Sequence, residues 1–114
     1  DAESAWWQRM EGHTQIMIPS RQFNPTMKEA INGLLQQSTD WKQWTDQCTE
    51  EELKREFDYK NIKGQSFRSA VWQIVHHLFN HGTYHRGQLV NMLRQLDVKK
   101  IPQTDFSVWC RRRV

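Results

Sequence analysis

Apolar residues recur every three or four positions along two long stretches of the chain, a spacing that predicts two amphipathic helices. The first stretch has a well-marked start, because Thr26 and Glu29 stand at capping-box spacing and Pro25 precedes them. Its apolar positions follow a period of 3.6 residues; they are Met27, Ile31, Leu34, Leu35, Trp41, Trp44 and Cys48. The pattern predicts a helix over residues 26–47.

The second stretch is the longest predicted element, a helix over residues 66–96 that begins at Ser66. On a wheel of about 100° per residue, its apolar residues fall on one stripe: Ile74, Leu78, Leu89, Met92 and Leu96. We expect this stripe to face the core. The segment from Asp97 to Pro102 ends the helix, and the remainder is predicted to be an extended tail.

Shorter patterns complete the chain. Residues 1–10 are typical of a helix that stops at Gly12, and alternation from Leu53 to Ile62 before a turn predicts an extended segment or small hairpin. Because the first residue is Asp and the helix starts without turn residues, we expect a further segment upstream, or one that is disordered or omitted. With 114 residues and no repeat, the chain is predicted to form a single helical domain over residues 1–114, incomplete at its N-terminus.

Composition excludes several classes of protein. The net charge of +3 comes from the terminal run at residues 111–113, and the rest of the chain is balanced, which argues against a nucleic-acid-binding face. No apolar run approaches the ~18 residues of a membrane span, so we expect no membrane partner. Cys48 and Cys110 lie far apart without a CxxC pair, which favours a reducing, cytoplasmic setting.

Four of the five histidines fall between residues 76 and 85, and two of them lie within the apolar stripe. His81 and His85 are one turn apart and lie about 20° to either side of Ile74. This i, i+4 spacing lets a helix offer two imidazoles to one metal ion. A buried histidine satisfied by other partners is the alternative, and spacing by itself leaves both interpretations open.

Two further residues lie beside this pair. Gln88 is close enough to hydrogen-bond His85, although it is equally compatible with a solvated boundary position. His77 lies at the stripe edge, and three rings at i, i+4 and i+8 would span about 12 Å of helix axis. We therefore expect His77 and Gln88 to be neighbours of the ligands rather than ligands themselves. No HExxH, GxSxG or glycine-rich phosphate loop accompanies them.

The stretch from His77 to Leu96, with its HxxxHRGQ motif, resembles the signature of the DinB-like (damage-inducible) metal-binding family. Other parts of the chain are similar to that family as well: Ala5–Met10, Phe57–Gly64, Pro102–Phe106 and Trp109. The resemblance covers nearly the whole chain.

The resemblance implies an all-α fold, a four-helix bundle that lacks its N-terminal helix here and carries a short extended segment before the last long helix. It also implies a homodimer and a divalent transition metal, zinc or nickel, held by three histidines. Two of the ligands map onto His81 and His85. The third belongs to the family's second helix, at a position expected upstream of residue 1, and Ala5–Met10 resembles the end of that helix. His13, which follows that helix, is given no such role.

Two hypotheses follow. The first is a cytoplasmic DinB-like protein that performs metal-dependent thiol transfer or hydrolysis on a small molecule or low-molecular-weight thiol, since some relatives use such thiols. The alternative is a non-catalytic helical dimerisation module with a structural or vestigial metal site. The sequence identifies neither a substrate nor a catalytic residue.

Overall fold

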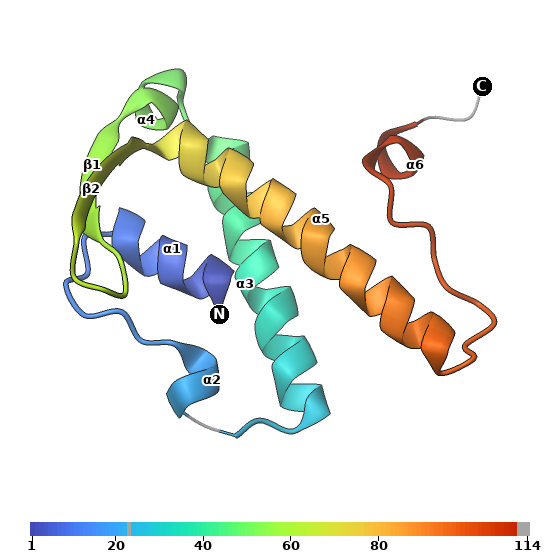
Figure 1. Cartoon of the computed structure of the whole chain (residues 1–114). Helices are drawn as coiled ribbons and strands as arrows, with labels where there is room; N and C mark the ends of the chain where they lie inside the picture. Colours follow the sequence, from blue (N-terminus) through green and yellow to red (C-terminus); the bar gives the residue numbers. More distant parts are fainter. Residues whose placement is uncertain (23, 112–114) are drawn as a thin grey trace. The chain divides into compact units, whose positions relative to one another are not determined.

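The computed structural model describes residues 1–22 and 24–111 (Figure 1). The described residues form six helices and one two-stranded sheet, in the order α1 (Ala2–Met10), α2 (Pro19–Gln22), α3 (Met27–Gln47), α4 (Glu50–Lys54), β1 (Glu56–Lys60), β2 (Ser66–Ala70), α5 (Val71–Gln95) and α6 (Phe106–Cys110). The chain divides into two compact units, Asp1–His76 and His77–Val114, with the boundary inside α5. The structure is thus mostly helical, as predicted. No helix among the described residues is long and apolar enough to cross a membrane.

Helix α3 confirms the prediction made from its capping pattern. The hydroxyl of Thr26 accepts a hydrogen bond from the Glu29 backbone N–H at 3.3 Å, and the Glu29 carboxylate accepts one from the Thr26 N–H at 2.8 Å. These two bonds satisfy backbone donors that the helix itself leaves unpaired. Hydrogen bonds from the side chain and backbone of Thr26 also lower the pKa of Glu29.

Helix α1 packs in the first unit between α3 and the β-hairpin (Figure 1). The Trp6 ring lies 4.9 Å from the Tyr59 ring of the hairpin, whereas the Trp7 ring lies 5.1 Å from the Trp41 ring of α3. Consecutive helical residues point about 100° apart, so the two neighbours serve different contacts. The indole N–H of Trp41 also donates to the backbone carbonyl of Glu3 at 3.2 Å. The buried apolar core of the chain is Ala5, Trp41, Phe57, Val71 and Ile74.

The extended segment is a hairpin, in which β1 pairs antiparallel with β2 and Tyr59 stands opposite Phe67. In the turn, the Asn61 side chain accepts from two backbone N–H groups, and Gly64 adopts a φ of 78° that favours glycine. The prediction that the long helix begins at Ser66 is wrong, because Ser66–Ala70 is strand β2 and α5 begins at Val71. Pairing with β1 holds these five residues extended.

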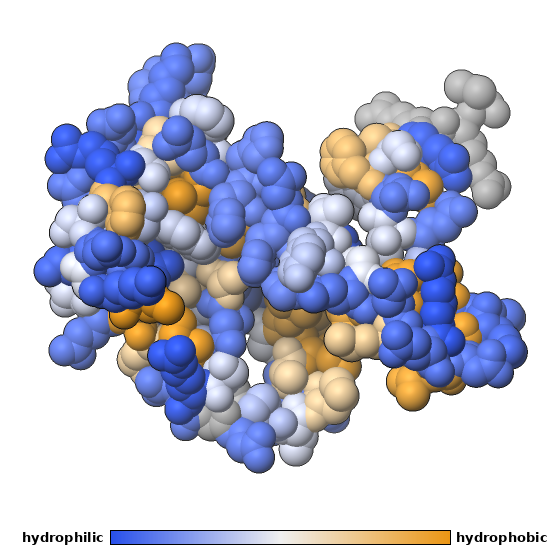
Figure 2. Space-filling model, viewed as in Figure 1, coloured by the Kyte–Doolittle hydropathy of each residue, from blue (hydrophilic) through white to orange (hydrophobic). Residues whose placement is uncertain are grey.

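The second unit contains most of α5 together with α6. The predicted extended tail is partly wrong, since Phe106–Cys110 forms the short helix α6, and Arg112–Val114 lie outside the described residues. The stripe of α5 is also less buried than predicted: Ile74 is buried and Leu78 half-buried, but Leu89, Met92 and Leu96 are exposed. Hydrophobic side chains are correspondingly visible at the surface in Figure 2. The single domain, the four-helix bundle and the missing N-terminal helix stay predictions.

Candidate metal centre

The histidine pair of α5 is brought together by the helix alone. His81 and His85 are separated by one turn, and their Nε2 atoms lie 3.0 Å apart. The two rings stand nearly perpendicular at 85°, with centroids 4.4 Å apart. His81 is half-buried and His85 is exposed, so the pair is accessible at the helix surface rather than enclosed in the core.

The orientation of His85 is set by Gln88. The Nδ1–H of His85 donates to the amide oxygen of Gln88 at 2.7 Å, because that oxygen can only accept. The amide nitrogen of Gln88 in turn donates to the hydroxyl of Tyr84 at 3.0 Å. A neutral His85 therefore carries its proton on Nδ1 and presents the lone pair of Nε2 toward His81.

His77 takes a different position from the pair. Its ring lies nearly parallel to the His81 ring, at a centroid distance of 5.5 Å and an angle of 26°, and its side chain is exposed. His77 thus stacks beside the first histidine. The structure brings together three of the four residues singled out from the sequence, His81, His85 and Gln88, and places His77 at one side of them.

Tyr84 is a member of this cluster that sequence analysis did not identify. Its ring lies 5.2 Å from that of His85, and its hydroxyl accepts from Gln88. The i, i+4 spacing of Tyr84 and Gln88 is a usable signal for such a contact. A tyrosine at this position is equally typical of an exposed helix surface, so the sequence alone does not predict its contact with Gln88.

Gly82, which follows the first histidine, leaves room for a charged neighbour. A Cβ atom at this position would stand 3.1 Å from an Nη of Arg86, whose guanidinium donates to the Thr83 hydroxyl at 3.0 Å. The guanidinium of Arg86 thus lies against the helix beside Gly82.

The geometry of the pair fits a metal ion. Bonds from a transition metal to imidazole nitrogen are about 2.0–2.1 Å long, so one ion can reach two nitrogens that lie 3.0 Å apart. A hydrogen bond on the far nitrogen of a ligand histidine, as Gln88 provides for His85, is the usual accompaniment of such sites. Among the described residues, no group of three or more His, Cys, Asp or Glu side chains is placed to hold an ion.

Comparison with known proteins relates the chain to the family that its HxxxHRGQ motif resembles. The sequence profile of the DinB family matches residues 1–109. The chain is 34% identical over 59 residues to the protein DinB of Bacillus subtilis (strain 168), an alignment that covers 52% of this chain and 34% of that protein. The aligned part thus spans about a third of the length of this curated relative. No solved structure matches the chain significantly.

Proposed function

Because this chain belongs to the DinB family, we propose that it binds a divalent transition metal ion, zinc or nickel, through Nε2 of His81 and Nε2 of His85. The observation that carries the proposal is the 3.0 Å approach of these two nitrogens, with Gln88 bound to the opposite side of the second ring. Two imidazole nitrogens are a donor set that suits zinc and nickel.

Two histidines leave the coordination of such an ion incomplete. The third protein ligand in this proposal is a histidine of the family's second helix, as the family resemblance implies. The remaining position is open to water or substrate. A divalent ion with an open position lowers the pKa of bound water or thiol and polarises a substrate carbonyl.

The residues of this chain have defined tasks in the proposal. Gln88 holds the proton of His85 on Nδ1 and keeps the ring from rotating, which directs the other nitrogen at the ion. Tyr84 accepts from the amide nitrogen of Gln88 and so restricts the movement of that side chain. These contacts order the pair before any ligand arrives, so less conformational entropy is lost on binding.

For the reaction we propose metal-dependent thiol transfer or hydrolysis on a small molecule, with a low-molecular-weight thiol as one candidate substrate. A cytoplasmic location fits this chemistry, since thiols stay reduced there.

Metal content after purification without chelator or His tag tests the proposal. Elemental analysis of the parent chain, reconstituted with zinc or nickel, should give close to one equivalent, and the His81→Ala/His85→Ala variant should give almost none. His76→Ala is the matched control, because His76 is an exposed histidine of the same helix outside the pair, and it should retain the metal. Equal metal content in the double variant and the parent would refute the proposal.

The alternative function, a helical dimerisation module, is favoured by one observation. Large apolar side chains of α3 are exposed in the single chain, among them Met27 at 77%, Leu34 at 57% and Leu35 at 61%. Such a face is typical of a surface that a second helical element covers. Adding azide to a cobalt-substituted sample separates the two functions, because an open coordination position changes the visible spectrum and a closed site does not.

A further inference from the structure

A groove of about 650 Å³ lies in the first unit, away from the histidine pair. We call it the hairpin groove. It is lined by Arg9 of α1, by Gly12, His13, Thr14 and Ile16 of the following loop, and by Asp58, Tyr59, Lys60, Ser66, Phe67 and Arg68 of the hairpin. This volume lies within the range of about 300–1,000 Å³ that is typical of small-molecule sites.

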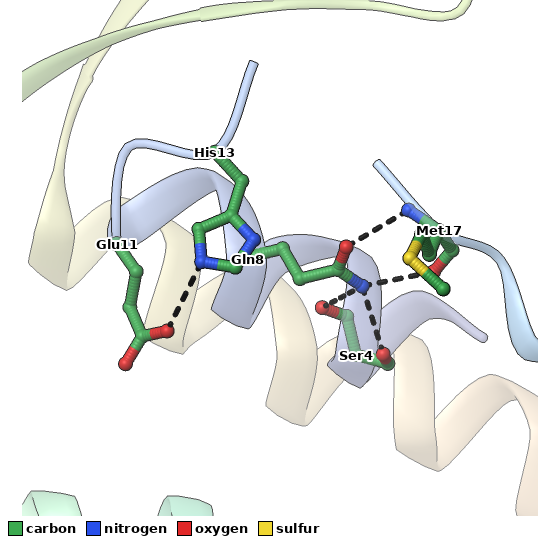
Figure 3. Close-up of polar contacts among 5 residues, drawn as sticks. All are labelled: Ser4, Gln8, Glu11, His13 and Met17. Carbon is green, nitrogen blue, oxygen red and sulfur yellow. Dashed lines mark hydrogen bonds and ion pairs between the residues drawn. The ribbon is translucent and has the colours of Figure 1, made fainter. Parts of the chain in front are cut away.

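The loop wall of the groove is held in place by one side chain of α1. Gln8 accepts from the backbone N–H of Met17 and donates to the carbonyl of the same residue, each at 2.8 Å, and donates to the Ser4 hydroxyl at 3.1 Å (Figure 3). In the same loop, the imidazole of His13 lies 3.6 Å from the carboxylate of Glu11 (Figure 3). The loop is therefore tied at both ends without a ligand.

Aromatic rings provide the hairpin side of the groove. Tyr59 and Phe67 are opposite each other in the register, and their rings stack at 5.9 Å with an angle of 26°. Asp58 and Arg68 also line the groove and stand opposite each other in the register. They form a bidentate ion pair at 2.7 and 3.0 Å, so their charges cancel.

Arg9 and Lys60 are cationic side chains that line this groove and have no ion pair among the described residues. The guanidinium carbon of Arg9 lies 4.7 Å from the centre of the Trp6 ring and 5.9 Å from that of Tyr59, contacts within cation–π range. Such contacts use the face of the guanidinium and leave its N–H groups, which lie in its plane, to other acceptors. The Nε of Arg9 is buried and has no hydrogen-bond partner among the described residues. Folded proteins rarely leave a buried donor in this state.

The C-terminal end of α1, which lies beside the groove, does not strongly repel an anion bound near Arg9. The last carbonyls of a helix carry partial negative charge and repel anions. Here the carbonyls of Trp7, Gln8 and Arg9 already accept from the backbone N–H groups of Glu11, His13 and Gly12, at 2.9–3.1 Å. The unpaired charge that lines the groove is therefore positive, from Arg9 and Lys60.

We propose that the hairpin groove binds a small anionic molecule with a planar apolar body, whose carboxylate or phosphate is taken by Arg9 and whose ring lies against Phe67 and Tyr59. Arg9 lines the groove, and carboxylates and phosphates suit the fork of donors that a guanidinium offers. The inference is independent of the metal site, because every residue it uses lies in the first unit.

Titration with phenyl phosphate tests the inference, with binding followed by ¹⁵N–¹H NMR of the backbone and of the arginine Nε–H groups. We expect saturable shifts of the Arg9 Nε–H and of residues in both strands, with a midpoint of about 1 mM or tighter. Inorganic phosphate lacks the ring and phenol lacks the charge, so each should bind at least about tenfold more weakly. No saturable shift up to about 20 mM phenyl phosphate, or binding of phenol as strong as that of phenyl phosphate, would overturn the proposal.

Variants locate the site. Arg9→Gln should weaken phenyl phosphate binding about tenfold or more, because it removes a charged donor. Phe67→Ala should weaken it by roughly fivefold, and since this ring is 46% exposed the hairpin tolerates its loss. Lys63→Gln removes a charge from the hairpin turn outside the groove and should bind like the parent, as should His81→Ala/His85→Ala. Parent-like binding in both Arg9→Gln and Phe67→Ala would place the ligand elsewhere and refute the assignment.

Discussion

Nε2 of His81 and Nε2 of His85 face each other across 3.0 Å on successive turns of α5. Two bare lone pairs at this distance repel, and so do two N–H groups. The arrangement is favourable only if one nitrogen donates a proton or if both lone pairs are directed at one cation. Since Gln88 holds the proton of a neutral His85 on Nδ1, the first case then requires His81 to donate, and the second requires a cation such as a metal ion.

The contact between Gln88 and His85 should affect metal affinity. Gln88→Leu removes the acceptor for Nδ1–H, so the ring is no longer held in one orientation and tautomer, and affinity should fall by about 10- to 100-fold. Competition with a chromophoric chelator measures this. Gln95→Leu, near the C-terminus of the same helix, is the control and should leave affinity unchanged. An unchanged affinity in the Gln88 variant would show that the contact plays no part in binding.

The cap of α3 should contribute measurably to stability. Thr26→Ala removes the hydroxyl that accepts from the Glu29 N–H, and the free energy of unfolding should fall by about 1 kcal/mol. Urea denaturation followed by circular dichroism measures the change. Thr39→Ala in the middle of the same helix is a matched control, since its hydroxyl only bonds back to the Leu35 carbonyl. Equal losses at the two positions would contradict a specific role of the cap.

Two apolar residues of the α5 stripe should differ in their contribution to stability, because one is buried and the other is exposed. Ile74 is 4% exposed, so Ile74→Ala should cost about 2–5 kcal/mol in the free energy of unfolding. Leu89 is 56% exposed, and Leu89→Ala should change stability by roughly 0.5 kcal/mol or less. Both values come from urea midpoints at low protein concentration. A loss at Leu89 as large as that at Ile74 would mean that this surface is covered in solution.

Acid should weaken the ion pair of the hairpin. The hydrogen bonds and charge of Arg68 hold the pKa of Asp58 below its ordinary value. A carboxyl whose pKa is lowered on folding stabilises the folded state above its unfolded pKa of about 3.9, and this contribution disappears as the pH falls through the folded pKa. The parent should therefore have a slightly higher urea midpoint than Asp58→Asn at pH 6, and the difference should shrink toward pH 3.

The size of this effect is limited by solvent. Both side chains of the pair are about two-thirds exposed, at 66% for Asp58 and 64% for Arg68, so water and salt screen their attraction. Added salt should reduce the difference at pH 6 as well. A difference that grows on acidification would contradict the assigned direction of the pKa.

Local signals account for what could be predicted from the sequence. Helix α3 was predictable because Thr26 and Glu29 form their cap within four residues, and the contacts of His85 with His81 and Gln88 were predictable because they follow from helical spacing. Whether these residues hold a metal stays a prediction.

Features that depend on contacts between distant segments could not be predicted from the sequence. Strand β2 was mistaken for helix because only its pairing with β1 keeps it extended. The hairpin groove went unnoticed because it joins Arg9 to Phe67, residues that share no motif. The exposure of Leu89 likewise depends on which surfaces meet it, and an apolar stripe alone carries no information on that.

The adjacency of Trp6 and Trp7 has a spectroscopic consequence. One indole reports on the hairpin through Tyr59 and the other on α3 through Trp41, although the two are consecutive in the chain. Because the chain has six tryptophans, the report on one contact is the difference in emission between the parent and a variant in which one of these two is replaced by phenylalanine. The loss of the contact between α1 and the hairpin and the loss of the contact between α1 and α3 can thus be followed separately by tryptophan fluorescence during unfolding.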